Sequence, residues 1–203
     1  MNQFIFLGDS ITDCDHIYDP DSLGYGYVRT IAENLSAKDT QFINLGYDGF
    51  TISALKRLWK RKADSLNPTC ITILIGINDI GVMKNTGLDP DFALEEFQMN
   101  YEMLIENIRK LYDCPIILME PFIFPCPQEF LTWEPEVKRM SSIIQNVAKR
   151  YHLSFLPLWN KLSRLTEELG YSCITTDGVH LTQEGHQYIA NLWLIFVKEL
   201  QLF

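Results

Sequence analysis

The stretch Phe4-Ile5-Phe6-Leu7-Gly8-Asp9-Ser10-Ile11-Thr12-Asp13 organises the rest of the chain. A short apolar run rich in Phe and Ile that ends at a glycine is typical of a buried strand. Gly8 would allow a sharp turn there, because glycine adopts positive φ at little steric cost. Ser10 would then lie just past the end of a strand, where an open parallel sheet places its ligands. We therefore treat Ser10 as a candidate nucleophile.

A structural role would also explain these residues. Asp9 or Ser10 could cap a helix that follows the turn, since both residue types are favoured N-caps. Short motifs of this kind also match by chance. A catalytic role for Ser10 therefore depends on whether partners for its hydroxyl group lie elsewhere in the chain.

The composition indicates one soluble globular domain, expected to span residues 1–203, with 47% hydrophobic and 21% charged residues. A net charge of −9 disfavours binding to nucleic acid, which needs a basic surface, and to anionic membranes. No signal-peptide pattern opens the chain and no apolar run is long enough to span a bilayer, so we expect no membrane association and a cytoplasmic location. A homo-oligomer is compatible with this composition.

The cysteines give no indication of a metal site. They are Cys14, Cys70, Cys114, Cys126 and Cys173, an odd number, and no two have the Cys-x-x-Cys spacing of zinc ligands. Reduced thiols in a reducing compartment are the simplest interpretation. We therefore expect neither a metal ion nor a disulfide framework.

Apolar strand segments alternate with helical segments along the chain. The predicted strands span residues 3–7, 41–45, 70–75, 115–119 and 153–158. The predicted helices span residues 26–36, 51–65, 91–112, 136–151, 160–169 and 182–200, with Thr51 as an N-cap. Residues 13–25 are expected to form a loop too polar for the core, and residues 81–90 and 123–135 two further loops.

This alternation decides the fold class. Strands that alternate with helices of about ten or more residues need crossover connections, which produce a parallel sheet with helices on both faces. The sequence therefore predicts an α/β fold, a three-layer α/β/α sandwich. Its rhythm suits a flavodoxin-like five-stranded parallel sheet of order 2-1-3-4-5.

Residues with complementary chemistry follow several of these strands. Gly46 follows the second strand, Asn78 follows the third, and Asp177 and His180 lie beyond the fifth. In a parallel sheet these ends lie at one edge. Acyl transfer needs a nucleophile, a base, a group that orients the base, and donors to the oxyanion. Of the four histidines, His180 is singled out as the base by its Asp-x-x-His arrangement with Asp177. The Asn78 amide and the Gly46 N–H would be oxyanion donors.

Each of these residues also has a structural explanation. Asp177-Gly178 has the composition of a turn, Asn78-Asp79 could lock a loop, and Thr182 could cap the last helix. The remaining histidines, His16, His152 and His186, are interpreted as solvated or structural. A chemically complete set at strand ends favours catalysis over several independent structural roles.

Four blocks of the chain resemble the signature blocks of the GDSL/SGNH hydrolases. They are Gly8-Asp9-Ser10, Asn44-Leu45-Gly46, Gly76-Ile77-Asn78-Asp79 and Asp177-Gly178-Val179-His180, with Ile11 where the family name has Leu. The resemblance implies ester hydrolysis on an α/β/α sandwich without metal or cofactor. It implies that Ser10 is the nucleophile and also an oxyanion donor through its N–H, with Gly46 and Asn78 as the other donors. His180 would be the base and Asp177 its partner.

Residues 6–14, 24–28 and 75–79 resemble the intracellular carbohydrate acetyl-esterases, such as acetylxylan-oligosaccharide esterases. This resemblance implies a small-molecule ester substrate, such as an O-acetylated sugar, and the short chain leaves little room for a lid over a long acyl group. Aromatic residues near strand ends could stack on a sugar or serve as core anchors: Tyr25, Tyr47, Phe50, Phe122, Phe124 and Trp133. A lysophospholipase or thioesterase on the same fold, and a flavodoxin-like binding module, are the alternatives.

Overall fold

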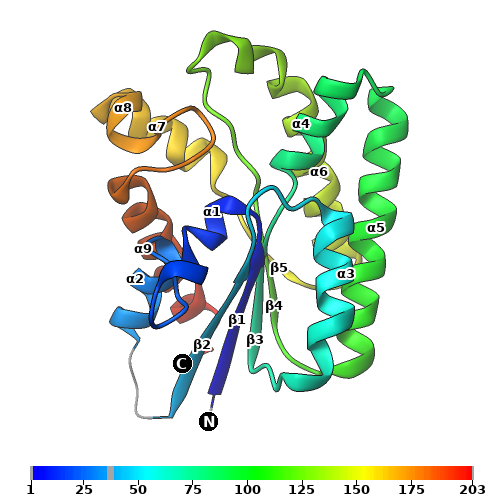
Figure 1. Cartoon of the computed structure of the whole chain (residues 1–203), viewed down its shortest axis with the longest axis vertical. Helices are drawn as coiled ribbons and strands as arrows, with labels where there is room; N and C mark the ends of the chain where they lie inside the picture. Colours follow the sequence, from blue (N-terminus) through cyan, green and yellow to red (C-terminus); the bar gives the residue numbers. More distant parts are fainter. Residues whose placement is uncertain (1, 36–38, 203) are drawn as a thin grey trace.

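The computed structural model describes residues 2–35 and 39–202. At its centre is a parallel sheet of order β2-β1-β3-β4-β5 (Figure 1). The strands are β1 (Asn2–Gly8), β2 (Thr40–Gly46), β3 (Cys70–Leu74), β4 (Ile116–Met119) and β5 (Ser154–Leu156). The predicted α/β class and the strand order 2-1-3-4-5 are confirmed. Since β1 lies between β2 and β3, the segment that follows it begins at an interior strand of the sheet.

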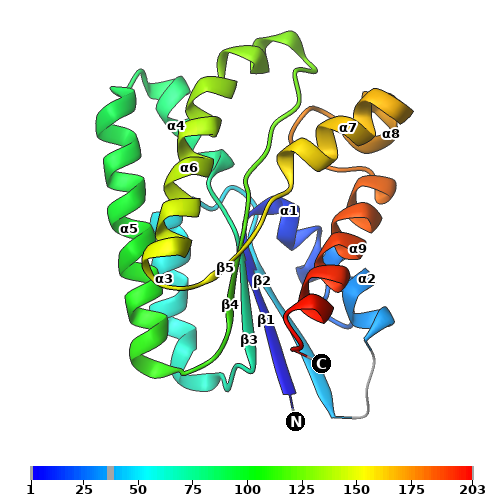
Figure 2. The same ribbon diagram turned by 180° about the vertical axis from the view of Figure 1, so that it is seen from behind.

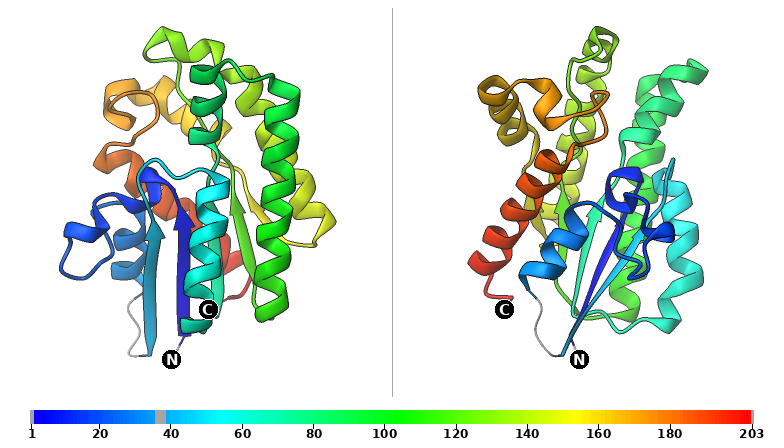
Figure 3. Two further views of the ribbon diagram at one scale, coloured as in Figure 1. Left: turned by 45° about the vertical axis from the view of Figure 1, so that its right-hand side comes forward. Right: turned by 60° about the vertical axis from the view of Figure 1, so that its left-hand side comes forward.

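Helices cover both faces of this sheet (Figures 2 and 3). One face carries α2 (Tyr27–Asn34) and α9 (Gln183–Glu199), with α7 (Trp159–Leu169) and α8 (Tyr171–Ile174) beyond the sheet edge. The other face carries α3 (Ile52–Lys62), α5 (Pro90–Leu111) and α6 (Glu134–Arg150). The short helices are α1 (Ser10–Asp13) and α4 (Ile77–Thr86), with 3₁₀ turns η1 (His16–Tyr18), η2 (Ala63–Ser65) and η3 (Gln128–Thr132). The predicted three layers are therefore present.

The side chains of β1 form the middle of the core because the strand is covered on both faces. Phe4 and Phe6 are buried, and both rings pack against Trp193 of α9, at centroid distances of 6.3 and 5.4 Å. The indole N–H of Trp193 donates to the Thr72 hydroxyl at 3.0 Å, so its polar atom is satisfied inside the core. This packing fixes β1 and, with it, the position of Ser10.

The predicted strands and longer helices match the observed ones to within two residues at each described end, except that the helix predicted over 51–65 ends at Lys62 and is followed by η2. The helix predicted over residues 26–36 corresponds to α2, and its predicted end, residue 36, lies outside the described residues. Thr51 caps α3 as predicted, with its hydroxyl accepting from the Ala54 N–H at 3.4 Å. Thr182 caps α9 in the same way, accepting from Gly185 at 3.2 Å. In the part of the chain that the structure describes, no helix is both long and apolar enough to cross a membrane.

Two loop predictions were wrong in part. Residues 81–90 were expected to be a loop, but α4 continues to Thr86 and ends at Gly87, whose φ is 68°. Gly81, the first residue of the predicted loop, lies inside the helix, where a Cβ atom would lie 3.4 Å from the Trp133 ring. The predicted loop 123–135 contains η3 and the first two residues of α6.

The polar segment 13–25 is more buried than predicted. Asp13, His16 and Asp19 expose only 6% to 8% of their surface. Burial is tolerated because their polar atoms are hydrogen-bonded. The Asp19 carboxylate, for example, accepts from the backbone N–H groups of Leu23 and Gly24 at 2.8 and 3.1 Å. A polar loop can therefore pack into the fold when it satisfies its own donors and acceptors.

Gly8 is required for a reason other than the predicted one. It is the last residue of β1 and is not among the glycines with positive φ. A Cβ atom at Gly8 would lie 2.6 Å from the Leu74 carbonyl oxygen and would also collide with Thr12. Glycine is needed here because the turn into α1 passes against the neighbouring strand.

Candidate active site

Ser10, His180 and Asp177 form a continuous chain of hydrogen bonds. Ser10 is the first residue of α1, two residues beyond β1, and its Oγ lies 2.8 Å from His180 Nε2. His180 Nδ1 lies 2.6 Å from Asp177 Oδ2. A carboxylate can only accept, so Nδ1 carries the proton and Nε2 is left to accept the proton of the Ser10 hydroxyl. The three side chains are therefore arranged so that the serine can be deprotonated.

A tight loop holds Asp177 and His180 at this distance. Asp177 Oδ1 accepts from the backbone N–H groups of Val179 and His180, at 2.9 and 2.7 Å. The Thr175 hydroxyl donates to the His180 carbonyl at 2.7 Å and accepts from the Gly178 N–H at 2.8 Å. Asp177 thus has the predicted structural role in a turn and also contacts the imidazole. The two interpretations are compatible.

The charge of Asp177 is stabilised by the same contacts. Partial burial acts to raise its pKa, but hydrogen bonds from the His180 ring and from two backbone N–H groups outweigh burial and hold the pKa below its usual range. The side chains of His180 and Asp177 remain 47% and 51% exposed. The carboxylate is therefore ionised at neutral pH in a site that is open to substrate.

The Asp-x-x-His arrangement is not unique to His180. Asp13 and His16 have the same spacing, and His16 Nδ1 lies 2.6 Å from Asp13 Oδ1. This second pair is buried, with exposed side-chain fractions of 11% for Asp13 and 8% for His16. Of the two roles considered for His16, solvated or structural, the burial of its side chain fits the structural one. His180 differs from His16 in its exposure and in its contact with Ser10.

Two of the three predicted oxyanion donors have hydrogens to offer. The Ser10 N–H lies in the first turn of α1, where a helix supplies no acceptor for backbone N–H groups. The Asn78 amide nitrogen donates to the Phe50 carbonyl at 3.1 Å. Because an amide NH₂ carries two hydrogens, the second is left for another acceptor.

The third predicted donor, Gly46, is not available. Its N–H donates to the Asn44 side-chain oxygen at 2.9 Å, inside the protein. Gly46 is glycine because β2 passes against the backbone of α1: a Cβ atom there would lie 2.7 Å from the Thr12 carbonyl carbon and would collide with the Asp13 nitrogen. The prediction that Gly46 donates to an oxyanion therefore does not fit the geometry.

Gly49 offers an N–H from the same loop. It is exposed, with φ 69°, and its N–H has no hydrogen-bond acceptor among the described residues. It follows Asp48, which lines the same cavity as Ser10, and precedes Phe50, which holds Asn78. The Asp48-Gly49 dipeptide, a common turn sequence, was the signal that could have identified it.

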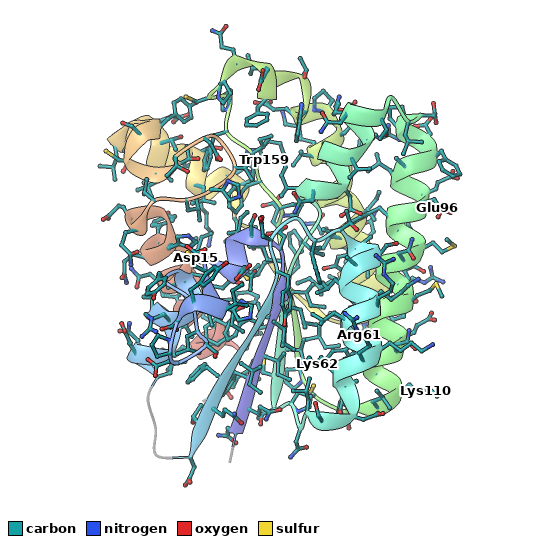
Figure 4. The ribbon with its side chains drawn as sticks, in the orientation of Figure 1. Asp15, Arg61, Lys62, Glu96, Lys110 and Trp159 are labelled. Atoms are coloured by element: carbon teal, nitrogen blue, oxygen red, sulfur yellow. The ribbon has the colours of Figure 1, made fainter. Side chains whose placement is uncertain are left out.

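A small cavity of about 270 Å³ adjoins Ser10 and His180. It is lined by Ser10, Ile11, Asp13, Cys14, Asp15, Asp48, His180, Leu181 and His186. Three of these residues are aspartates, and none is a lysine or arginine. Figure 4 shows Asp15 beside α1, whereas Arg61, Lys62 and Lys110 lie on α3 and α5 on the opposite side of the sheet. The surroundings of Ser10 are therefore acidic.

Two carboxyl groups, of buried Asp9 and partly buried Asp79, hold the starts of two helices. Asp9 caps α1 by accepting from Ile11 at 3.1 Å, and burial raises its pKa to about 7. Asp79 accepts from the Ile52 N–H at the start of α3, at 3.1 Å, and burial together with nearby Asp9 raises its pKa to about 7. Asp79 therefore fixes the start of α3, in keeping with the structural role considered for it, while its neighbour Asn78 holds the Phe50 carbonyl.

All five cysteines are free thiols. In residues 2–35 and 39–202, no group of three or more His, Cys, Asp or Glu side chains could hold a metal ion. Cys14 lines the cavity that adjoins Ser10, and its Sγ is 3.6 Å from His186 Nε2. Burial raises the pKa of the Cys14 thiol, which keeps it protonated.

A serine, an imidazole and a carboxylate joined at the carboxyl edge of a parallel α/β sheet have the geometry of a serine hydrolase site. Comparison with known families specifies the class. Residues 6–188 match the model of the GDSL-like Lipase/Acylhydrolase family. The chain belongs to this family of carboxylic ester hydrolases.

Esterases from several organisms are similar in sequence to this chain along most of its length. The acetylxylan esterase of Geobacillus stearothermophilus is 25% identical, over 95% of this chain and 92% of the esterase. The isoamyl acetate-hydrolyzing esterase 1 homolog of Rattus norvegicus is 23% identical, over 97% of this chain and 82% of its own. A solved structure of a catalytic mutant of the Geobacillus esterase superposes with a TM-score of 0.83 at 24% identity, covering 96% of this chain and 93% of the other.

Proposed function

We propose that this protein hydrolyses short-chain carboxylic esters, chiefly acetyl esters of sugars or other small neutral alcohols, through an acyl-enzyme intermediate. The observation that carries the proposal is the hydrogen-bonded chain from Ser10 through His180 to Asp177, with links of 2.8 and 2.6 Å. Ser10 is the nucleophile, His180 the general base, and Asp177 the group that orients the imidazole and stabilises its charged form.

The reaction proceeds in two similar halves. Ser10 Oγ attacks the ester carbonyl while its proton moves to His180 Nε2, and the alcohol then leaves with that proton. Water attacks the acyl-serine in the second half, with His180 again as base. The Ser10 N–H, the Asn78 amide and the Gly49 N–H would hold the oxyanion, with Gly49 in the place first assigned to Gly46.

The size and lining of the cavity favour a short acyl group. Its volume is about 270 Å³, and Ile11 and Leu181 are the only aliphatic side chains among its lining residues. Each buried CH₂ contributes about 0.8 kcal/mol when it finds an apolar surface. A long acyl chain would find little such surface here, so extra methylene groups add size without binding energy.

The charge of the cavity favours a leaving group without negative charge. Asp13, Asp15 and Asp48 line it, and no lining residue is cationic. Carboxylates accept hydrogen bonds from hydroxyl groups, as a polyol would offer. The phosphate of a lysophospholipid or of coenzyme A would be repelled. This argues against a lysophospholipase or an acyl-CoA thioesterase.

The relatives support the same proposal. The Geobacillus protein is named as an acetylxylan esterase, and the rat protein is named for hydrolysing isoamyl acetate. Solved structures of the Geobacillus enzyme include catalytic mutants in which a serine, an aspartate or a histidine is replaced by alanine. These are the residue types of Ser10, Asp177 and His180.

The first prediction tests this function directly. Ser10→Ala should lower kcat on p-nitrophenyl acetate by about 10⁴-fold or more, since triad members act as a unit. A fluorophosphonate probe should label Ser10 in the unaltered protein and fail to label the variant. Ser141→Ala, which removes a serine bonded to Glu120 away from the cavity, is the matched control and should retain full activity. Hydrolysis by Ser10→Ala at the unaltered rate would refute the mechanism.

An acyl-length series then tests the substrate class. We expect p-nitrophenyl acetate and butyrate to be hydrolysed well and the octanoate poorly. Acetylated sugars should be deacetylated, with the released acetate measured directly. A maximum at eight carbons or longer would favour the lysophospholipase alternative, and a preference for acetyl-CoA would favour the thioesterase.

A further inference from the structure

The buried pair Asp13 and His16 contacts the loop that follows β2. Asp13 Oδ1 accepts from the backbone and the ring of His16, at 3.1 and 2.6 Å. Asp13 Oδ2 accepts from the Asp48 N–H at 2.9 Å. The His16 ring packs edge-on against Tyr47, with centroids 5.1 Å apart. Both members of the pair therefore hold the segment 47–50 against α1.

This segment is a turn that presents the Gly49 N–H. The Phe50 N–H donates to the Tyr47 carbonyl at 3.2 Å, and Gly49 occupies the third position with φ 69°. That position needs a positive φ in a type II turn, which favours glycine. Asp48, the second residue of the turn, is the one whose N–H is bonded to Asp13. The orientation of the next N–H, that of Gly49, thus depends on this bond.

The opposite side of the turn holds Asn78. Its amide donates to the Phe50 carbonyl at 3.1 Å, and the Tyr47 and Phe50 rings stack at 5.0 Å. The turn is therefore fastened to Asn78 at one end and to the Asp13 and His16 pair at the other. A shift of the turn would move the Gly49 N–H and the Asn78 amide together.

We propose that Asp13 and His16 are positioning residues, which hold the turn 47–50 so that the Gly49 N–H and the Asn78 amide meet the developing oxyanion. This inference rests on the proposed ester hydrolysis. Both carboxylate oxygens of Asp13 are occupied by His16 and the Asp48 N–H, so the pair acts through the Asp48 N–H and the Tyr47 ring and has no hydrogen bond to Ser10 Oγ. It repeats the Asp-x-x-His spacing of the triad for a different purpose.

The test combines kinetics with hydrogen exchange. Asp13→Asn keeps the size of the side chain but exchanges one acceptor oxygen for a donor, so the Asp48 N–H or the His16 ring loses its partner. Since a misplacement of about 1 Å can cost about 10²-fold in rate, kcat on p-nitrophenyl acetate should fall by about tenfold to a hundredfold, with KM nearly unchanged. The Asp48 amide should exchange its hydrogen faster.

Two variants of His16 refine the test. His16→Leu removes the donor to Asp13 and should reproduce the loss of kcat. His16→Asn places an amide nitrogen near the position of Nδ1 and should restore most of it. A structural role alone would not produce a loss in kcat that the conservative variant rescues.

Asp19→Asn is the matched control. Asp19 is a buried aspartate of the same polar segment, but it holds Leu23, Gly24 and Arg29 instead of the turn 47–50. The Asp19→Asn variant should have a lower melting temperature, while its kcat and its Asp48 amide exchange stay unchanged.

Unchanged kcat and unchanged Asp48 exchange in Asp13→Asn would overturn the inference. If the unaltered protein hydrolyses no ester, the proposed function fails, and the exchange of the Asp48 amide still decides whether Asp13 holds the turn.

Discussion

Two glycines three positions apart have different physical reasons for being glycine. Gly46 is buried and its N–H is bonded to Asn44, so what matters there is the missing Cβ atom. Gly49 is exposed, and no atom would lie within 4 Å of an added Cβ, so what matters is its positive φ of 69°. A sequence shows both only as glycines that follow a strand.

The consequence for stability is a testable difference between two alanine variants. Gly46→Ala forces a Cβ atom against the backbone of Thr12 and Asp13 and should lower the free energy of unfolding by about 3 kcal/mol or more, as overpacking of a rigid core does. Gly49→Ala meets no atoms and should lose only about 1 kcal/mol for its left-handed backbone. Urea unfolding of both variants measures the difference. A larger loss for Gly49→Ala would contradict this account of the loop.

At the scale of single residues, the sequence indicated which residue types form the site but not how they are arranged in space. Ser10, Asp177 and His180 were predicted from residue type and from their places after strands, and the structure joins their side chains. The spacing that singled out His180 occurs again at His16, since Asp-x-x-His describes any turn in which a carboxylate reaches an imidazole. Which pair faces Ser10 is decided by the path of the chain through space, which local spacing does not contain.

At the scale of elements, the start of α9 packs a histidine into the fold beside α2. His186 is buried, its Nδ1 accepts from the Tyr27 N–H at 3.3 Å, and burial, with a smaller contribution from the nearby His180 imidazole, lowers its pKa to about 4. It is therefore neutral at neutral pH. In the unfolded chain its pKa would be near the ordinary value of about 6.5.

The pH dependence of stability follows from this difference. Below about pH 6.5 the unfolded chain binds a proton at His186 that the folded protein does not bind until about pH 4, so this residue makes stability fall as the pH falls through that interval. His186→Gln should remove this contribution, and the difference in unfolding free energy from the unaltered protein should shift in favour of the variant between pH 7 and pH 5. Urea unfolding at several pH values measures it. Gln187→Ala, in the same turn of α9, should keep the original slope.

The elements that sequence patterns missed are those without a strong apolar period. α4 contains Gly81, and glycine is unfavourable in helices, yet the helix persists because it packs against Trp133 and ends at Gly87. The segment 13–25 looked like solvent-exposed loop because it is polar, yet Asp13 and Asp19 satisfy enough N–H groups to be buried. Tertiary contacts decided both cases, whereas the strands and amphipathic helices followed from their patterns alone.

At the scale of the whole molecule, the acidity of the chain extends to the lining of the cavity beside Ser10. The net charge is −9, and the cavity beside Ser10 is lined by aspartates, while Arg61, Lys62 and Lys110 lie on α3 and α5, away from the site (Figure 4). A substrate approaching the site therefore meets a negative potential that salt can screen.

This field predicts how salt affects different substrates. The kcat/KM for 4-acetoxybenzoate, an anion, should rise several-fold between about 20 and 500 mM salt, because screening weakens its repulsion. The value for its neutral methyl ester should stay nearly constant. Asp48→Asn should reduce the salt dependence for the anion and leave that of the neutral ester unchanged. An equal response of the two esters would show that the acidic lining does not select by charge.

The triad joins positions far apart in the order of synthesis. Ser10 and His180 are 170 residues apart. At translation rates of about 5 to 20 residues per second, roughly 10 to 30 s pass between the addition of the two residues. During that time the growing chain carries an ordinary serine hydroxyl with no base beside it. The proposed triad is therefore complete only after the segment with Asp177 and His180, which follows the last strand of the sheet, has folded against Ser10, and an unfinished chain cannot cleave esters by this mechanism.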